Sequence, residues 1–343
     1  MILYVLRRFV NYVILTAVAT TFSYVAASLF LNPAKKYQGL NPPVPKESIA
    51  NLMRQYGVYR GDPVALRTWH WIENIFTAPF HEKLGMGLSN NWVITEMLGK
   101  PENALTFWNI QWLGRSGVSL RLLIVGALLG ALLGVIIGVW GAVRQYKFSD
   151  QFFSYASFVL ISSPTFVIGL LLMILATKLN QILGFQLIRF SGAYSPGYHG
   201  FGAILDLGVH LLLPTIALVL FGAAGYSRYM RAVMLDVLGS DFIRTARAKG
   251  ATRNRALVKH GVRVAMIPMS TYFAYQFGTL VAGSTFLEII FSWKGMGQFG
   301  IQAIQTSDIN AMAGVVCYTG ILVLFASTLS EILYAALDPR VRM

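Results

Sequence analysis

The most distinctive chemistry in this sequence lies in a basic stretch, residues 228–263, which carries nine of the 28 lysines and arginines. Within this stretch, Asp241 could cap a short helix that ends near Gly250, and a second amphipathic segment follows at residues 253–262. Such a segment suits two kinds of contact. It could bind anionic lipid, at about 1 kcal/mol for each cation near the surface, or it could dock another protein. The residue types alone leave both alternatives open.

The residue patterns that carry catalysis are absent from the sequence. There is no GxxxxGK(S/T) stretch, so a site for nucleotide phosphates would have to come from another polypeptide. There is no GxSxG motif, and the five histidines are scattered without the spacing of metal ligands. We therefore expect no catalytic residue, no metal site and no cofactor bound by this chain.

Two carboxylates, Glu288 and Glu331, fall near the ends of apolar runs. A carboxylate inside the membrane is a functional candidate. Near a membrane interface, however, a contact with water or with a neighbouring cation is the simpler interpretation.

The composition indicates that most of the chain is solvated by lipid. Hydrophobic residues make up 55% of it and charged residues only 12%, whereas a soluble domain carries about 25% charged residues. The net charge of +14 does not indicate nucleic acid, because the cations fall mostly between long apolar runs. The sequence predicts an all-α integral membrane protein with six transmembrane helices. They are placed at about residues 8–31, 119–142, 152–178, 207–230, 264–290 and 311–337.

The distribution of cations predicts the orientation. If the N-terminus is cytoplasmic, the inner segments hold fifteen lysines and arginines, and the two short outer loops hold only Lys178, Arg189 and Lys294. This bias predicts that both termini and the basic stretch face the cytosol. The segment 32–118 is left out of the comparison, because long loops cross the membrane regardless of their charge.

The spans divide the chain into three predicted parts. They are the N-terminal cytoplasmic end with the first span, residues 1–31; an extracytoplasmic lobe, residues 32–118; and a core of five spans, residues 119–343, with a cytoplasmic loop at 231–263. In the lobe, apolar residues at helical spacing predict a helix that ends at Gly57, and a second helix should run from Pro63 to about Phe76. Glycines four residues apart from Gly126 to Gly138 predict a stripe against which another helix packs closely.

Five stretches of sequence, in this order and topology, resemble a known family. They are SPTF at 163–166 with GLL at 169–171; HLLLP at 210–214; YSRYMR at 226–231 with DFIRTARAKG at 241–250, HGVR at 260–263 and IP at 267–268; EIIFSWKGMG at 288–297; and LDPRVR at 337–342. The third resembles the EAA loop of ABC-importer permeases, and the set is most similar to the B-type permeases of dipeptide and oligopeptide importers. The resemblance covers nearly the whole chain and is looser in the lobe.

A few residues depart from the patterns of this family. Arg244 stands where the general permease pattern has glutamate, and Thr245 where it has its first alanine. The peptide branch, whose pattern reads like YxRTARAKG, shares both departures. Phe242 replaces the usual tyrosine of that branch, and Lys294 replaces the usual proline.

The resemblance implies a fold and a set of partners. The fold would be that of type I ABC importer permeases, in the bacterial cytoplasmic (inner) membrane. This chain and a second homologous permease subunit would form the pathway as a heterodimer. Two ATP-binding subunits would hold ATP and Mg²⁺, and an extracytoplasmic substrate-binding protein would deliver peptides. Nickel chelates, haem and sugars stay as alternative cargoes, because close relatives of peptide permeases carry them.

The resemblance also implies site residues. The helix that couples to the ATP-binding subunit would comprise Asp241, Phe242, Ile243, Arg244, Thr245, Ala246, Arg247, Ala248, Lys249 and Gly250. Cargo would pass between the two permease subunits, past polar or small positions of the third to fifth helices. The candidates are Ser162, Ser163, Gln276, Thr279, Ser284 and Thr285. Packing between helices explains any one of these six equally well.

Two other classes of protein stay as alternatives. A stand-alone membrane enzyme, such as an intramembrane protease, would need a nucleophile and a base within the spans, and Ser284 has no histidine nearby in the sequence. A channel or secondary carrier acting alone should show inverted repeats or broken helices around an ion site.

Overall fold

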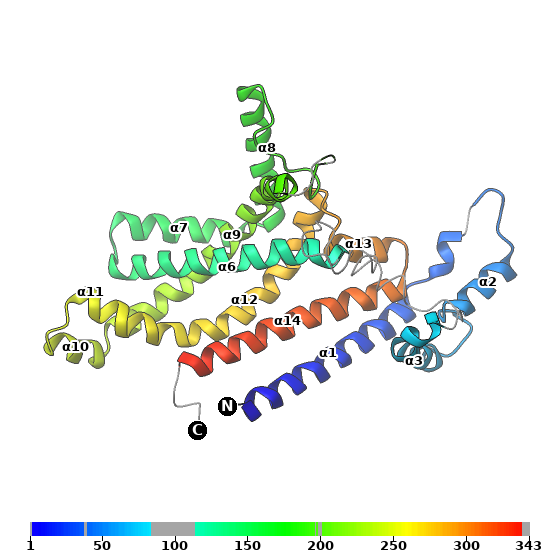
Figure 1. The fold of residues 1–343 in the computed structure, drawn as a ribbon, viewed down its shortest axis with the longest axis horizontal. Helices are drawn as coiled ribbons and strands as arrows, with labels where there is room; N and C mark the ends of the chain where they lie inside the picture. Colours follow the sequence, from blue (N-terminus) through cyan, green and yellow to red (C-terminus); the bar gives the residue numbers. More distant parts are fainter. Residues whose placement is uncertain (1, 38–39, 84–113, 196, 198–200, 338–343) are drawn as a thin grey trace. The chain divides into compact units, whose positions relative to one another are not determined.

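The computed structural model describes residues 2–37, 40–83, 114–195, 197 and 201–337. Every regular element within these residues is a helix, as Figure 1 shows, and this confirms the predicted all-α fold. The chain forms two compact units. The larger contains the described residues of 1–10, 120–293 and 323–343, and the smaller contains those of 11–119 and 294–322.

Five of the described helices are long and apolar enough to cross a membrane. They are α1 (Ile2–Phe30), α6 (Gly114–Val143), α8 (Thr165–Leu183), α9 (Phe201–Leu238) and α14 (Ile309–Leu337). A sixth long helix, α12 (Arg263–Ile290), lies where the fifth span was predicted. It falls short of the same apolar criterion, since it carries Gln276, Glu288 and two tyrosines. The helices therefore agree with a multi-pass membrane protein.

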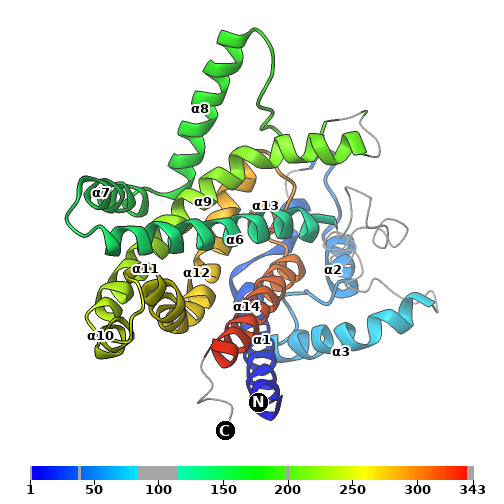
Figure 2. The same ribbon diagram turned by 60° about the vertical axis from the view of Figure 1, so that its left-hand side comes forward.

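The predicted third span, residues 152–178, is wrong as one continuous helix. It is broken into α7 (Phe148–Ser162) and α8, with Ser163 extended at φ −90° and ψ 131°. The cause is Pro164, which lacks an N–H and disfavours the helical conformation of the residue before it. As a result α8 leaves α7 in a new direction, which is visible in Figures 1 and 2.

The predicted glycine stripe of α6 is confirmed, and it packs against α9. A Cβ atom added to Gly134 would lie 2.3 Å from Cβ of Tyr226, and one added to Gly138 would lie 2.7 Å from the carbonyl oxygen of Ser227. The two backbones therefore approach so closely that a methyl group does not fit between them. Helix α7 also packs against α9, so that α6, α7 and α9 lie together in the larger unit.

The smaller unit contains the described part of the predicted lobe. It includes the short helices η1 (Pro33–Tyr37), α2 (Lys46–Gln55) and α13 (Met296–Gln305) and the longer helix α3 (Val64–Lys83). The predicted end of the first lobe helix is confirmed, because Gly57 has φ +68° and donates its N–H to the carbonyl of Arg54. The core includes Tyr24 and Trp71, whose rings stack 4.5 Å apart. Residues 84–113 of the predicted lobe and most of the LDPRVR stretch lie outside the described residues.

Candidate functional site

The basic stretch folds into short helices at one end of α9 and α12. Helix α9 continues beyond residue 230, where the fourth span was predicted to end, and runs to Leu238. It is followed by α10 (Asp241–Ala248), α11 (Arg253–Ala256) and a π-helix, η2 (Leu257–Val262), that leads directly into α12. Figures 1 and 2 show α10 and α11 side by side at this end of the larger unit.

A helix is present where the coupling helix was predicted, and its start differs by one residue from the prediction. Ser240 occupies the N-cap position, and Asp241 is the first helical residue instead of the cap. The hydroxyl of Ser240 donates to the carbonyl of Val237, so it closes the end of α9 and does not cap α10. At the other end Gly250 has φ +89° and donates its N–H to the carbonyl of Arg247. A glycine in this conformation ends the helix close to the predicted position.

Helix α10 packs against the rest of the larger unit through one buried side chain. Ile243 is its only buried residue, with 6% of its surface exposed, and it belongs to a core cluster with Met234 and Val237 of α9 and Leu257 of η2. Ala246 is partly buried, and the other predicted coupling residues are exposed. The helix is thus anchored on one face and presents its remaining surface outward.

A basic hollow lies beside α10. It has a volume of about 480 Å³ and is lined by Phe242, Thr245, Ala246, Lys249, Gly250, Ala251, Arg255, Lys259 and His260. Its lining contains three cations and no carboxylate, and Phe242 leaves 42% of its surface exposed. The exposed ring of Phe242 and the guanidinium of Arg255 are side chains of the kinds that are enriched at protein interfaces, so this hollow is a candidate docking surface.

The six predicted path residues have different surroundings. Gln276 is buried and packs so closely on α9 that a Cβ added to Gly225 would lie 2.2 Å from its Nε2 atom. Ser284 is also buried, and its hydroxyl donates to the carbonyl of Val281 in its own helix. Among the other four, Thr279 bonds to the preceding turn of α12, Thr285 is half-buried, and Ser162 and Ser163 lie at the break between α7 and α8. Their role in the path stays a prediction.

The two carboxylates near helix ends also differ. Glu331 of α14 lies 3.8 Å from the guanidinium of Arg8 in α1, which agrees with a contact to a neighbouring cation. Glu288 is 1% exposed near the end of α12, where its backbone carbonyl accepts a bond from the N–H of Trp293.

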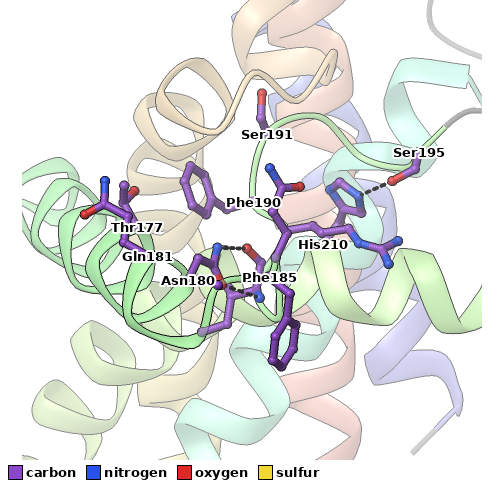
Figure 3. A pocket seen from close by; sticks show the side chains of 12 residues that line it. Thr177, Asn180, Gln181, Phe185, Phe190, Ser191, Ser195 and His210 are labelled. Atoms are coloured by element: carbon purple, nitrogen blue, oxygen red, sulfur yellow. Dashed lines mark hydrogen bonds between the residues drawn. The ribbon is translucent and has the colours of Figure 1, made fainter.

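A second hollow, of about 580 Å³, lies at the opposite end of the larger unit's helices, where α8 ends (Figure 3). It is formed by the last turns of α8, the segment 184–195 and His210 of α9. The amide of Asn180 bonds to both backbone groups of Ile188, so this segment is held against α8. By the predicted topology this hollow opens to the outside.

One wall of this hollow is a buried polar cluster that we did not predict. The carboxylate of Asp206 accepts bonds from Arg189 and, at 2.6 Å, from the N–H of Ser195. The hydroxyl of Ser195 lies 3.0 Å from Nε2 of His210. The signal in the sequence was an aspartate and a histidine four residues apart beside an apolar run, but their partners lie on a separate segment.

These residue types also occur in hydrolytic triads, yet their geometry differs. Ser195 and Asp206 both approach the same nitrogen, Nε2 of His210, and Nδ1 has no partner among the described residues. In a triad the serine and the acid bond to opposite nitrogens of the ring. The cluster therefore cannot work as a serine nucleophile with an oriented base, and it fastens the segment 184–195 to α9.

Together the long apolar helices and the close α6–α9 packing define an all-helical protein of the multi-pass membrane class. Residues 130–343 match the family model described as "Binding-protein-dependent transport system inner membrane component". The chain belongs to this family, whose members are transport subunits, with the fold of type I importer permeases.

Similar proteins match between 41% and 99% of the chain. The oligopeptide transport system permease protein OppB of Mycobacterium tuberculosis (strain ATCC 25618 / H37Rv) is 42% identical over 342 residues, which cover 99% of both chains. The oligopeptide transport system permease protein AppB of Bacillus subtilis (strain 168) is 28% identical over 303 residues, 88% of this chain and 87% of the relative. The dipeptide transport system permease protein DppB of Escherichia coli (strain K12) is 41% identical over 141 residues, 41% and 42% of the two chains.

Proposed function

We propose that this chain is a permease subunit of an ATP-driven importer and forms half of the path through which peptides cross the membrane. The observation that carries the proposal is α10, an exposed basic helix held to the bundle by the single buried side chain of Ile243. The names of the relatives, which are oligopeptide and dipeptide permeases, support peptides as the cargo.

In this function residues 241–250 lie in a cleft of an ATP-binding subunit. Arg244, Arg247 and Lys249 are exposed and supply positive charge for docking, while the small side chain of Ala248 allows close approach. When the two ATP-binding subunits close on ATP and Mg²⁺, they displace α10. Because α9 runs from the span to within three residues of α10, the displacement reaches the membrane and shifts the bundle between inward-open and outward-open states.

The working complex contains further chains. A second homologous permease subunit completes the path, two ATP-binding subunits supply the energy, and an extracytoplasmic binding protein delivers the cargo. The complex lies in the bacterial cytoplasmic membrane, with both termini of this chain in the cytosol. The excess of cations in the predicted inner segments supports this orientation.

The first test enlarges the surface of α10. Ala248 is exposed, so Ala248→Trp should leave the fold intact and obstruct docking, with Ala248→Ser as the matched small control. A lost anchor at an interface costs on the order of 2 kcal/mol, which is about a 30-fold loss of affinity for the ATP-binding subunit. The measurement is retention of that subunit on purification, together with uptake of a labelled peptide by proteoliposomes holding the complete complex. Unchanged uptake by Ala248→Trp would refute the docking role of α10.

The same proteoliposomes discriminate between cargoes. We expect ATP-dependent uptake of labelled oligopeptides, and no uptake of a nickel chelate, haem or a sugar, when the cognate binding protein is present. Uptake of one of these in place of peptides would leave the docking role intact and replace the cargo.

A further inference from the structure

A buried ion pair ties the turn between α6 and α7 to α9. The carboxylate of Asp150, in the first turn of α7, is 3% exposed. It accepts two bonds from the guanidinium of Arg231, from Nε at 2.6 Å and from Nη2 at 2.8 Å. The N–H of Tyr146 donates a third bond, at 3.0 Å, to the same carboxylate. Two parallel bonds between guanidinium and carboxylate fix both distance and orientation.

Two neighbouring residues, Gly141 and Tyr146, accommodate this pair. A Cβ added to Gly141 of α6 would lie 3.0 Å from Oδ1 of Asp150 and 3.4 Å from Cδ of Arg231, so glycine leaves room for the contact. Tyr146 has φ +64°, a conformation that a non-glycine residue rarely adopts, and its N–H faces the carboxylate. The bond from Arg231 holds the pKa of Asp150 below its ordinary value, so the carboxylate is ionised at neutral pH.

A second contact joins the same two helices. The hydroxyls of Ser157 in α7 and Ser227 in α9 lie 3.1 Å apart and are both buried. Ser157 lies seven residues after Asp150 in α7, and Ser227 lies four residues before Arg231 in α9. Helix α7 therefore contacts α9 through polar side chains at two levels. Helix α8, in contrast, is separated from α7 by the extended residue Ser163.

The fastened part of α9 adjoins the seat of α10. Arg231 lies about two helical turns before the end of α9 at Leu238. Between them Met234 packs in the same core cluster as Ile243, the anchor of α10. Helix α9 therefore connects the seat of α10, at Met234, to Asp150 through Arg231, which lies three residues earlier on the same helix.

We propose that the Asp150–Arg231 pair is a positioning lock that makes α7 move together with α9 when α10 is displaced. This rests on the proposed function, in which an ATP-binding subunit grips α10. The pair touches neither cargo nor nucleotide. It acts through α9, by transmitting the displacement to a second helix.

The decisive experiment links α7 and α9 covalently in the complete reconstituted complex. In a Cys317→Ser background, which removes the one native cysteine, Ser157→Cys and Ser227→Cys place two thiols at the contact that the two hydroxyls now make. If the helices move together, the oxidised disulfide leaves peptide uptake per ATP hydrolysed within about twofold of the reduced protein. A block of uptake that a reductant reverses would show that the helices separate during transport, and would overturn the lock.

The complementary experiment removes the pair. In Asp150→Asn we expect uptake per ATP to fall by about two- to thirtyfold, because the displacement no longer reaches α7. Oxidation of the Ser157→Cys/Ser227→Cys pair in the same protein should restore peptide uptake per ATP hydrolysed. If Asp150→Asn acted only by lowering the stability of the protein, the disulfide would not restore this ratio. Failure of the link to restore it would overturn the lock. An unchanged ratio in Asp150→Asn with the link absent would contradict the proposal. Should Asp150→Asn fail to assemble, the exchanged pair Asp150→Arg/Arg231→Asp replaces it. Because this pair can re-form the ionic contact, we expect assembly and at least partial uptake per ATP, and an assembled complex that hydrolyses ATP without uptake would contradict the proposal.

These outcomes are separate from those that test the proposed function. If the wild-type complex takes up no peptide, or Ala248→Trp has no effect, the proposed function fails. If both behave as expected and the disulfide alone blocks uptake, only the lock fails.

Discussion

At the scale of single residues, two charges of α9 are paired with opposite charges on other segments. Asp206 near one end pairs with Arg189, and Arg231 near the other pairs with Asp150. A buried charge without a partner is strongly unfavourable, so each pair also fixes the segment that supplies the partner. Both ends of this long helix are thus joined to neighbouring segments by ionic contacts.

The outer pair can be tested through stability. In Asp206→Asn the guanidinium of Arg189 loses its charged partner while the shape of the side chain is kept. Breaking a buried pair costs about 3–5 kcal/mol, and the lower value applies here because Arg189 is 33% exposed. We expect a lower midpoint of thermal unfolding in detergent and faster proteolysis within residues 184–195. Gln186→Ala, at an exposed position of the same segment, is the control; equal midpoints for both variants would mean that the pair does not hold the segment.

At the scale of helices, the glycines of α6 permit its close contact with α9. A substitution at Gly134 tests this contact. In Gly134→Ala the new Cβ would lie 2.3 Å from Cβ of Tyr226 and 2.9 Å from the carbonyl oxygen of Ala223, so the helices must move apart. Overpacking of this kind costs about 1–3 kcal/mol. Gly208→Ala in α9 is the matched control, because a Cβ there meets no atom within 4 Å.

The control should gain stability, since alanine favours a helix over glycine by about 1 kcal/mol. The measurement is again the midpoint of thermal unfolding of the purified protein in detergent. If Gly134→Ala were as stable as Gly208→Ala, the close α6–α9 contact would be wrong.

Much of the helical layout could be predicted from the sequence, because hydrophobic length and glycine spacing are local properties of the chain. The ends of α2 and α10 followed from Gly57 and Gly250, which adopt the left-handed conformation that ends a helix. The break before Pro164 was missed, since hydrophobicity continues across it while the backbone does not.

The parts of the site that depend on tertiary contacts could not be predicted. Asp150 and Arg231 lie 81 residues apart, and the segment that holds Ser195 reaches Asp206 only after the chain has turned back. Periodicity and motif patterns depend on residues that are neighbours along the chain, so they do not predict contacts between residues far apart in the sequence. The seat of α10 is a similar case, because the sequence shows that Ile243 is apolar but not that α9 and η2 enclose it.

At the scale of the whole molecule, the proposed function depends on which side of the membrane each end of the bundle faces. An ATP-binding subunit can grip α10 only from the cytosol, and a binding protein can reach the hollow beside residues 184–195 only from outside. The excess of cations around α10 predicts this orientation. Both ends carry exposed residues that can be labelled, Asn254 in α11, which lies beside α10 but outside the docking residues 241–250, and Gln186 in the outer segment.

The orientation can be measured by cysteine labelling in the Cys317→Ser background. Asn254→Cys should react with a membrane-impermeant maleimide only after the cells are made permeable, because the intact membrane keeps the reagent from the cytosol. Gln186→Cys, the control for access from outside, should react in intact cells. The reverse pattern would place α10 outside the cell, where no ATP-binding subunit could reach it. Because docking of the ATP-binding subunit, the lock between α7 and α9, and delivery of cargo from outside the cell all assume the same orientation, this single reversal would refute all three together.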